Sequence, residues 1–338
     1  MNNEKINLLF PFKIGYKMMT LSETVNYGNK MHNIPEMWKK TKGNGILIGV
    51  IDTGLPVHRD LKNQIVDSIN FTESPIEDKI VGHGTHVAGV IAAEENGEGV
   101  VGIAPKAKLV IAKALGDDGS GSDEWLANAI YWCIDKKVDI INMSLGAPAE
   151  YDHAFPQTKQ AVVDAYNKGI IIVCASGNEN ADKVGIPAKY KETFSVMAVN
   201  SKEERASFSN RGERLDFAAA GVDILSTFKN ETFASLSGTS MACPQIAGIV
   251  ALILSEHKSG QEKDTPINNP EDMREHIRKI CVDLGNIGFD VNFGNGLPVF
   301  GKIEENNPPI IPPKPPIIEP VKKKNWFWKI IDSLFGNF

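Results

Sequence analysis

Four mainly apolar runs recur along the first half of the chain, and the third of them also contains Asp139 and Asn142. Mainly apolar runs of this length are typical of strands that are buried on both faces, as in a parallel sheet. The predicted strands cover residues 46–51, 109–112, 138–143 and 170–174.

Helical patterns lie between these runs. Segment 122–136 has Ser122 as its N-cap and two acids in the first turn, and segment 158–168 ends at Gly169. Further helices are predicted over 85–93 and after residue 240, where apolar residues recur at helical spacing: Ile246, Ile249, Val250, Ile253 and Leu254. Strands that alternate with helices indicate the α/β class, with a mostly parallel central sheet and helices on both faces.

Polar residues follow three of the predicted strands directly. These are Asp52 after the first run, Ser144 after the third and Asn178, in Ser-Gly-Asn, after the fourth. Because functional groups of parallel sheets gather beyond the carboxyl ends of the strands, we expect these side chains to share one edge.

Composition narrows the function classes. The chain has 338 residues, a formal net charge of -6 and a pI near 5.7. This acidic balance argues against the class of nucleic-acid-binding proteins, which carry an excess of basic residues. Its four cysteines, Cys133, Cys174, Cys243 and Cys281, form no C-x-x-C pair and are interpreted as free thiols, which suits a reducing compartment. We find no signal-peptide pattern and no apolar run of membrane-spanning length, so the expected location is the cytoplasm.

Ser240 lies in Gly-Thr-Ser immediately before the last predicted helix. From this stretch alone, a helix cap and a nucleophile are equally good interpretations. Acyl transfer by serine also needs a base, a carboxylate that orients the base and donors for the oxyanion. His83, Asp52 and Asn178 supply these residue types, and although each has an ordinary structural role when taken singly, the chain order Asp, His, Ser is a recognised triad order.

Three motifs make the combination specific: Asp-Thr-Gly at 52–54, His-Gly-Thr-His-Val-Ala-Gly at 83–89 and Gly-Thr-Ser-Met-Ala-Cys-Pro at 238–244. They resemble the signature motifs of subtilisin-like serine proteases, the subtilases, and the similarity extends over residues 34–299. The resemblance implies a three-layer subtilisin-like fold and a serine endopeptidase that acts through an acyl-enzyme. Ser240 would be the nucleophile, His83 the general base and acid, Asp52 the orienting carboxylate and Asn178 an oxyanion donor.

The resemblance also implies the substrate-binding segments. Residues 115–121 and 144–146 resemble two edges between which a peptide lies as an added strand, and Glu179 would line the first specificity pocket and admit a basic side chain. The implied substrate-binding residues are Gly119, Ser120, Gly121, Ser144, Leu145, Gly146 and Glu179.

A structural calcium ion is the implied cofactor. Residues 94–100 resemble the calcium loop of the family, in which Asp60 and the Asn96 side chain would join the backbone carbonyls of Glu94, Glu98 and Val100. Oxygen ligands of this kind suit calcium. A solvated acidic loop is the alternative.

Residues 1–20 are expected to form an inhibitory extension. Leu9, Phe10, Pro11 and Phe12 resemble the motif with which intracellular bacterial subtilases cover their active sites, and Pro11 would distort the backbone there and prevent cleavage. A frayed terminus is the alternative. The intracellular branch also suggests a homodimer.

The expected organisation is completed by a peptidase domain at 21–303, a proline-rich linker at 304–321 and a basic, aromatic tail at 322–338. The tail would dock weakly on a membrane surface or a partner, or else pack on the protein itself. Protein or peptide substrates are expected. Two alternatives to a general protease stay open, a non-catalytic peptide-binding pseudoprotease and a maturation protease for one peptide.

Overall fold

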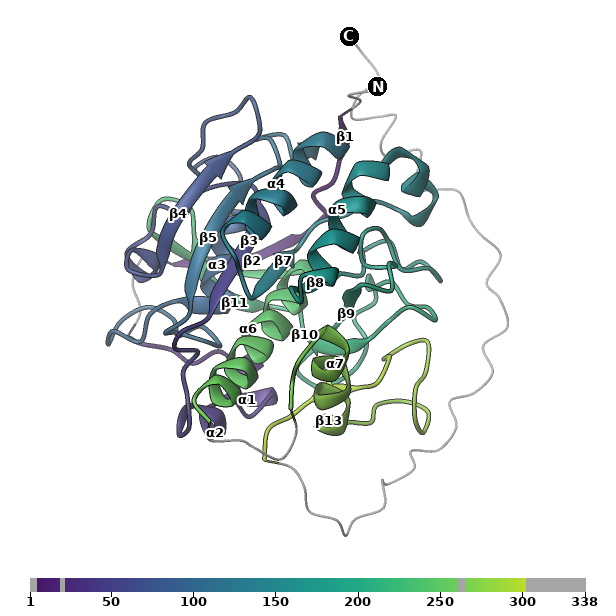
Figure 1. The fold of residues 1–338 in the computed structure, drawn as a ribbon. Coiled ribbons are helices and arrows are strands. Elements are labelled where there is room, and N and C mark those ends of the chain that lie inside the picture. Colours follow the sequence, from purple (N-terminus) through teal and green to yellow (C-terminus); the bar gives the residue numbers. More distant parts are fainter. Residues whose placement is uncertain (1–4, 19–21, 261–265, 302–338) are drawn as a thin grey trace. The chain divides into compact units, whose positions relative to one another are not determined.

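The computed structural model describes residues 5–18, 22–260 and 266–301. Its central sheet has seven parallel strands within the described chain, in the order β10-β9-β8-β7-β3-β5-β4 (Figure 1). The predicted linker and tail lie outside the described residues. The strand bounds are β3 Leu47–Asp52, β4 Ile65–Asn70, β5 Lys108–Lys113, β7 Ile140–Met143, β8 Ile171–Ala175, β9 Thr193–Val199 and β10 Phe217–Ala220.

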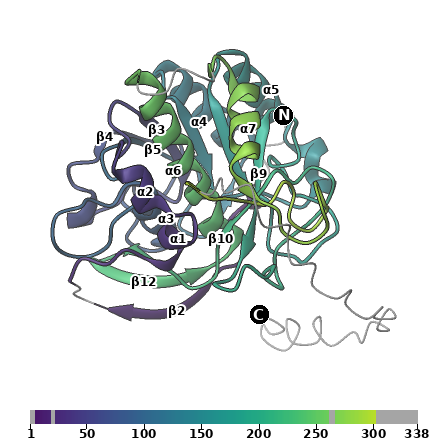
Figure 2. The ribbon, with the colours of Figure 1, turned by 90° about the horizontal axis from the view of Figure 1, so that it is seen from below.

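Helices cover both faces of this sheet (Figures 1 and 2). α3 and α6 pack on one face and share a core with α2 and α7, whereas α4 and α5 pack on the other. The α/β fold class is therefore confirmed. The helix bounds are α1 Tyr27–Met31, α2 Ile34–Trp38, α3 His83–Ala92, α4 Asp123–Asp135, α5 Pro156–Asn167, α6 Thr239–Lys258 and α7 Pro270–Lys279, with 3-10 turns η1 Arg59–Leu61 and η2 Ala149–Ala154.

Smaller sheets surround the central one. The strand β2 is the outer strand of a three-stranded antiparallel sheet in the order β11-β12-β2, and β1 pairs with β6. Both pairings bring residues near the N-terminus against strands far along the chain. The bounds are β1 Ile6–Asn7, β2 Lys13–Met18, β6 Ser120–Gly121, β11 Ile224–Phe228, β12 Thr232–Ser237, β13 Cys281–Val282 and β14 Leu297–Pro298.

The helix α6 is the centre of one core layer. In the described part of the chain it alone is long and apolar enough to cross a membrane, but 94% of its apolar window is buried inside the protein. Its apolar side chains pack against β7, β8, β9 and β10. The apolarity of α6 therefore reflects its place in the core.

The predicted strands and helices are present, with boundary shifts of at most two residues. Ser122 caps α4 by accepting a hydrogen bond from the Trp125 backbone N–H at 3.2 Å, and Gly169 after α5 has φ +82°. The cysteines Cys133, Cys174 and Cys243 are buried free thiols, and Cys281 is half-buried. Burial raises the thiol pKa of all four, so they are poor nucleophiles.

Candidate active site

The adjacent parallel strands β3, β7 and β8 bring three predicted residues to one edge of the sheet. Asp52 ends β3, Ser144 follows β7, and Asn178 follows β8 after Ser176 and Gly177. Gly177 has φ +110°, a conformation that favours glycine, so the chain turns sharply there before Asn178. The expectation that these side chains share an edge is confirmed.

Asp52 and His83 form a buried pair. The Asp52 Oδ1 atom accepts hydrogen bonds from His83 Nδ1 at 2.7 Å and from the Thr53 backbone N–H at 2.7 Å, and both side chains are fully buried. The Nε2 atom of His83 and the Oδ2 atom of Asp52 have no hydrogen-bond partner among the described residues. The contact fixes the imidazole ring and leaves its second nitrogen available for proton transfer.

Asp78, which the sequence analysis did not single out, binds Thr53 and Gly82, the chain neighbours of Asp52 and His83. Its Oδ1 atom accepts from Thr53 Oγ1 at 2.9 Å and from the Gly82 backbone N–H at 2.8 Å, and its Oδ2 atom accepts from the Thr85 backbone N–H at 2.8 Å. Asp78 therefore caps the first turn of α3, where His83 lies. Burial is the largest influence on the Asp78 carboxyl and raises its pKa. Gly82 and Thr85 lie four and seven residues after Asp78, whereas Thr53 lies 25 residues before it.

Ser240 is the second residue of α6, whose N-cap is Gly238. The Ser240 side chain caps no helix end, since its Oγ atom donates to the Ser144 carbonyl at 3.0 Å. Ser144 in turn donates its hydroxyl to the Ser240 carbonyl at 3.0 Å. Ser240 is fully buried, and its hydroxyl makes no hydrogen bond to the Nε2 atom of His83.

The side chain of Asn178 connects the start of α6 to the N-terminal segment. Its Oδ1 atom accepts from the Thr239 backbone N–H at 2.9 Å and from Thr239 Oγ1 at 2.8 Å, and these bonds aim the Nδ2 donor. Nδ2 donates to the carbonyl oxygen of Pro11 at 2.8 Å. Asn178 thus caps α6 from outside and holds a peptide carbonyl at the same time.

Residues 6–12 lie across this site, with a strand at Ile6–Asn7 and a bend at Leu9. The backbone N–H groups of Leu8 and Leu9 both donate to Gly119 O at 3.1 Å, and Gly146 N–H donates to Leu8 O at 2.9 Å. The strand β1 pairs with Ser120 and Gly121 in β6. These are edge positions that the resemblance implied for a peptide, and here the chain's own segment occupies them.

The side chains of this segment fill the site. Leu8 occupies an apolar pocket beside Phe155 and Tyr190 and leaves a residual cavity of about 10 Å³. Phe10 is buried next to Gly146, and the Phe12 ring centroid lies 5.1 Å from that of His83. Asp52, His83 and Ser240 are fully buried, and Asn178 is half-buried.

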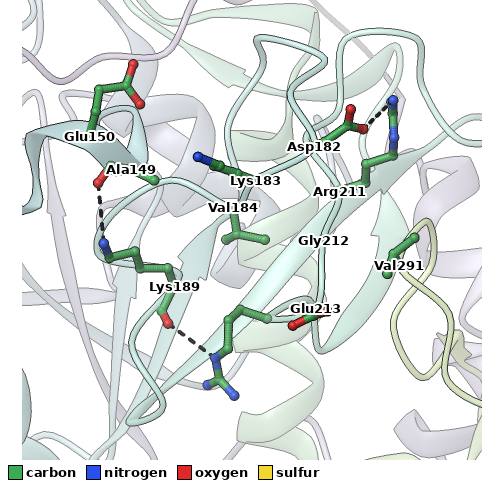
Figure 3. Close-up of a pocket in the computed structure, with 11 residues that line it drawn as sticks. Ala149, Glu150, Asp182, Lys183, Val184, Lys189, Arg211, Gly212, Glu213 and Val291 are labelled. Atoms are coloured by element: carbon green, nitrogen blue, oxygen red, sulfur yellow. Dashed lines mark hydrogen bonds and ion pairs between the residues drawn. The ribbon is translucent and has the colours of Figure 1, made fainter.

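Two of the remaining substrate-binding candidates make other contacts. Glu179 accepts a hydrogen bond from Asn210 Nδ2 at 2.6 Å, and Leu145 is buried in the core. A groove of about 690 Å³, lined by charged residues such as Lys183, Arg211 and Glu213, lies elsewhere (Figure 3). None of the catalytic candidates lines this groove.

The calcium candidates Asp60 and Asn96 lie together. The buried Asp60 carboxylate accepts from the Val100 backbone N–H at 3.2 Å through Oδ2 and from Asn96 Nδ2 at 3.3 Å through Oδ1. Burial raises the Asp60 pKa. A buried carboxylate held by neutral donors is a favourable place for a cation, so the donor set fits a calcium ion.

Other features of this loop differ from the expectation. The Glu94 side chain accepts from Asn63, and Glu98 N–H donates to Asn96 Oδ1 at 3.0 Å. Glu23, which the sequence analysis did not single out, accepts from the backbone N–H groups of Asn96 and Gly97 at 2.8 and 2.7 Å. In the described ranges, no three His, Cys, Asp or Glu side chains converge on a metal-sized site. Calcium ligation would therefore depend on Asp60 with amide and carbonyl oxygens.

Comparisons with known proteins agree with this geometry. The model of the subtilase family matches residues 43–296. The intracellular serine protease of Paenibacillus polymyxa is 40% identical over 306 residues, which cover 86% of this chain and 91% of that protein. The major intracellular serine protease of Bacillus subtilis is 43% identical over 269 residues (75% and 83%), and subtilisin E of the same organism is 39% identical over 283 residues (82% and 70%).

Proposed function

The chain belongs to the subtilase family and is a subtilisin-type serine endopeptidase, and from this premise we propose that Asp52, His83 and Ser240 are its catalytic triad. The observation that carries the proposal is the hydrogen bond from Asn178 Nδ2 to a peptide carbonyl, that of Pro11, at 2.8 Å. An amide donor that already binds a peptide carbonyl beside a buried Asp–His pair is suited to stabilise the oxyanion of acyl transfer.

In the proposed reaction, His83 Nε2 takes the proton of Ser240 Oγ while Oγ attacks the carbonyl carbon of the scissile bond. Asp52 keeps the Nδ1 proton of His83 in place and stabilises the imidazolium. His83 then gives its proton to the leaving amine as the C–N bond breaks, which forms the acyl-enzyme. Water, deprotonated by His83, hydrolyses the ester and regenerates Ser240.

Two donors would stabilise the tetrahedral oxyanion. One is Asn178 Nδ2, and the other is the backbone N–H of Ser240. As the second residue of α6, Ser240 has a backbone N–H without an intrahelical acceptor. The positive end of the helix dipole also favours negative charge there.

We propose that residues 1–20 inhibit the enzyme, and the contacts of residues 6–12 support this. The segment occupies the edges at Gly119 and Gly146, its Pro11 carbonyl takes the Asn178 donor, and the Ser240 hydroxyl bonds to Ser144 and not to His83. Pro11 supplies no backbone N–H to position the carbonyl for attack. In this proposal the segment binds like a substrate without being cleaved at Pro11, and its removal activates the enzyme.

We further propose that one structural calcium ion binds between Asp60 and the loop 94–100, with the Asn96 side chain and the carbonyls of Glu94, Glu98 and Val100 as oxygen ligands. The ion would neutralise the buried Asp60 carboxylate and crosslink η1 to the loop. A cytoplasmic location belongs to the same proposal, because two of the relatives are named intracellular serine proteases. The homodimer and the docking of tail 322–338 stay predictions that rest on no described contact.

Labelling with a fluorophosphonate, of the full chain and of a chain without residues 1–20, tests the catalytic assignment. Because Ser240 is buried in the full chain, we expect slow labelling there and fast labelling once residues 1–20 are removed. In both cases the label should be on Ser240, as located by peptide mass spectrometry, and the Ser240→Ala chain should carry none. If neither the full chain nor a chain without residues 1–20 is labelled, the pseudoprotease alternative is correct. A peptide-library cleavage profile then separates a general protease from a maturation protease with a single substrate.

A further inference from the structure

We propose that the edge of β12, which β2 occupies in this structure, is an extended binding site for the part of a polypeptide substrate that follows the cleaved bond. The substrate would add an antiparallel strand to β12 over about seven residues, with a basic side chain favoured at the sixth. This inference rests on the proposed function, since it assumes that substrates run through the site in the direction of the N-terminal segment.

The path of the N-terminal segment sets the direction. Asn178 holds the carbonyl of Pro11, and Phe12 lies against His83, so in this register the next residues follow the bond at the catalytic centre. Lys13 then pairs with Ser237, which is three residues before Ser240, and Met18 pairs with Phe233. Residues 13–18 therefore extend the path of a substrate away from the centre.

β2 is bound mainly through its backbone. From Lys13 to Lys17 every residue is exposed, including the apolar Ile14 and Tyr16, which are 44% and 50% exposed. The partner strand β12 is buried and is held on its other side by β11. A rigid edge that binds a strand with so little side-chain burial is suited to bind varied sequences, because backbone hydrogen bonds do not depend on side-chain identity.

Two contacts give this edge a side-chain preference. A Cβ at the position of Gly15 would lie 3.4 Å from the side-chain oxygens of Asp223 and Ser235, which is the near limit of ordinary contact, so alanine fits there. Lys17 Nζ lies 4.9 Å from the ring centroid of Phe228. Counted from the Pro11 carbonyl, Lys17 is the sixth residue, and the Phe228 ring favours a cation at that place.

A length series of peptides tests the inference with the full chain. The peptides share the segment before the cleaved bond and carry one, three, five, seven or nine residues after it. Competition from the N-terminal segment lowers kcat/KM by the same factor for all of them, so their ratios report on the β12 edge. We expect kcat/KM to rise by about tenfold or more between one and seven residues, because several net-stabilising hydrogen bonds are added, and then to level off.

N-methylation of single peptide amides gives the sharper result. In an added antiparallel strand, alternate amides point to the neighbouring strand, but the register of β2 on β12 shifts between Ile14 and Lys17. Methylation should therefore lower kcat/KM at one of the second and third residues and at one of the sixth and seventh, and leave the other residue of each pair unaffected. Norleucine in place of lysine at the sixth residue should lower kcat/KM by about two- to fivefold, and the same change at the ninth residue should have no effect.

The outcomes separate this inference from the proposed function. Equal kcat/KM values across the length series, or a methylation profile in which both residues of each pair respond equally, overturn the extended site and leave the protease assignment intact. If no peptide is cleaved either by the full chain or by a Phe12→Ala chain, in which the N-terminal segment binds less tightly, the proposed function itself fails.

Discussion

The side-chain amide of Asn178 donates to the carbonyl oxygen of Pro11 at 2.8 Å, across 167 positions of the sequence. The same side chain accepts two hydrogen bonds from Thr239, so its orientation is fixed by the residue that precedes Ser240. The N-terminal segment is thereby coupled to the start of α6, and both the inhibition and the catalysis that we propose depend on this one amide.

Weakening the N-terminal segment should raise the activity of the full chain. Phe12→Ala removes the ring beside His83 and its burial, which contributes up to about 3 kcal/mol in binding the segment. We expect kcat/KM for a short peptide to rise by about tenfold or more, and deletion of residues 1–20 to raise it further. Initial rates measured before any autolysis provide the check.

The matched control is Val66→Ala, which truncates an exposed apolar residue on β4, far along the chain from the segment. Its rates should equal those of the parent. Activity that stays unchanged after deletion of residues 1–20 would contradict the inhibitory role and favour the frayed terminus.

Asn178→Ala should slow turnover with little change in KM. Removal of one preorganised oxyanion donor typically lowers kcat by about a hundred- to a thousandfold, since the donor acts mainly in the transition state. The measurement is steady-state kinetics on the chain without residues 1–20. In that chain Asn178 does not bind the Pro11 carbonyl, so the variant gains no activity from weaker binding of the N-terminal segment. The measured fall in kcat then reports the lost oxyanion donor alone.

Since Asn178 also accepts from Thr239, a folding control is needed for this variant. The melting temperature and the fluorophosphonate labelling rate of Ser240 should be compared, and the labelling should slow while the fold is retained. A kcat equal to that of the parent would refute the oxyanion role.

Acid should destabilise the protein partly through His32. This side chain is fully buried, its Nδ1 atom lies 2.7 Å from Pro298 O, and burial lowers its pKa from 6.5 to about 4. Above pH 6.5 the ring is neutral in both states and has no effect. As the pH falls from 6.5 towards 4, the unfolded chain binds a proton that the folded chain does not, so the free energy of unfolding falls by up to about 1.4 kcal/mol per pH unit.

His32→Asn keeps a donor for Pro298 but does not titrate, so its unfolding free energy should depend less on pH between 6.5 and 4. Urea unfolding at several pH values measures this slope, in the Ser240→Ala background to prevent autolysis. His153→Asn, at an exposed histidine in η2, is the control. Parallel slopes for His32→Asn and the parent would show that His32 does not contribute.

The sequence predicts four of the seven central strands, because their physical requirement is local, and it does not predict β4, β9 and β10. Parallel strands covered on both faces need continuous apolar runs, and β3, β5, β7 and β8 all have them. Functional residues at the ends of these strands follow from the same pattern, which is why Asp52 and Asn178 could be placed on one edge before the structure was known.

The parts that the sequence did not predict depend on partners outside the element itself. The strand β2 has exposed side chains and is held by the backbone of β12, so no hydrophobic pattern marks it. The helix α3 begins at His83, two residues before the predicted start, because Asp78, which precedes the helix, supplies its cap. Likewise, the cap of α6 comes from Asn178 and not from Ser240. Bonds of this kind leave no signal in the hydrophobic pattern of the element that they stabilise.

The buried carboxylate of Asp60 leads to the last prediction. Burial without a full counter-charge is unfavourable, which is why the pKa of this group is raised, and a bound calcium ion would relieve it. In the Ser240→Ala background, calcium at about a hundred times its Kd should stabilise the parent by about 2.7 kcal/mol relative to chelator, seen as a higher melting temperature.

Asp60→Asn should abolish this increment and, in chelator, melt at or above the temperature of the parent, because the buried charge is gone. Asn96→Ala should reduce the increment, whereas Glu73→Gln, at an exposed carboxylate, should preserve it. A melting temperature of the parent that is the same in calcium and in chelator would mean that this loop holds no structural ion.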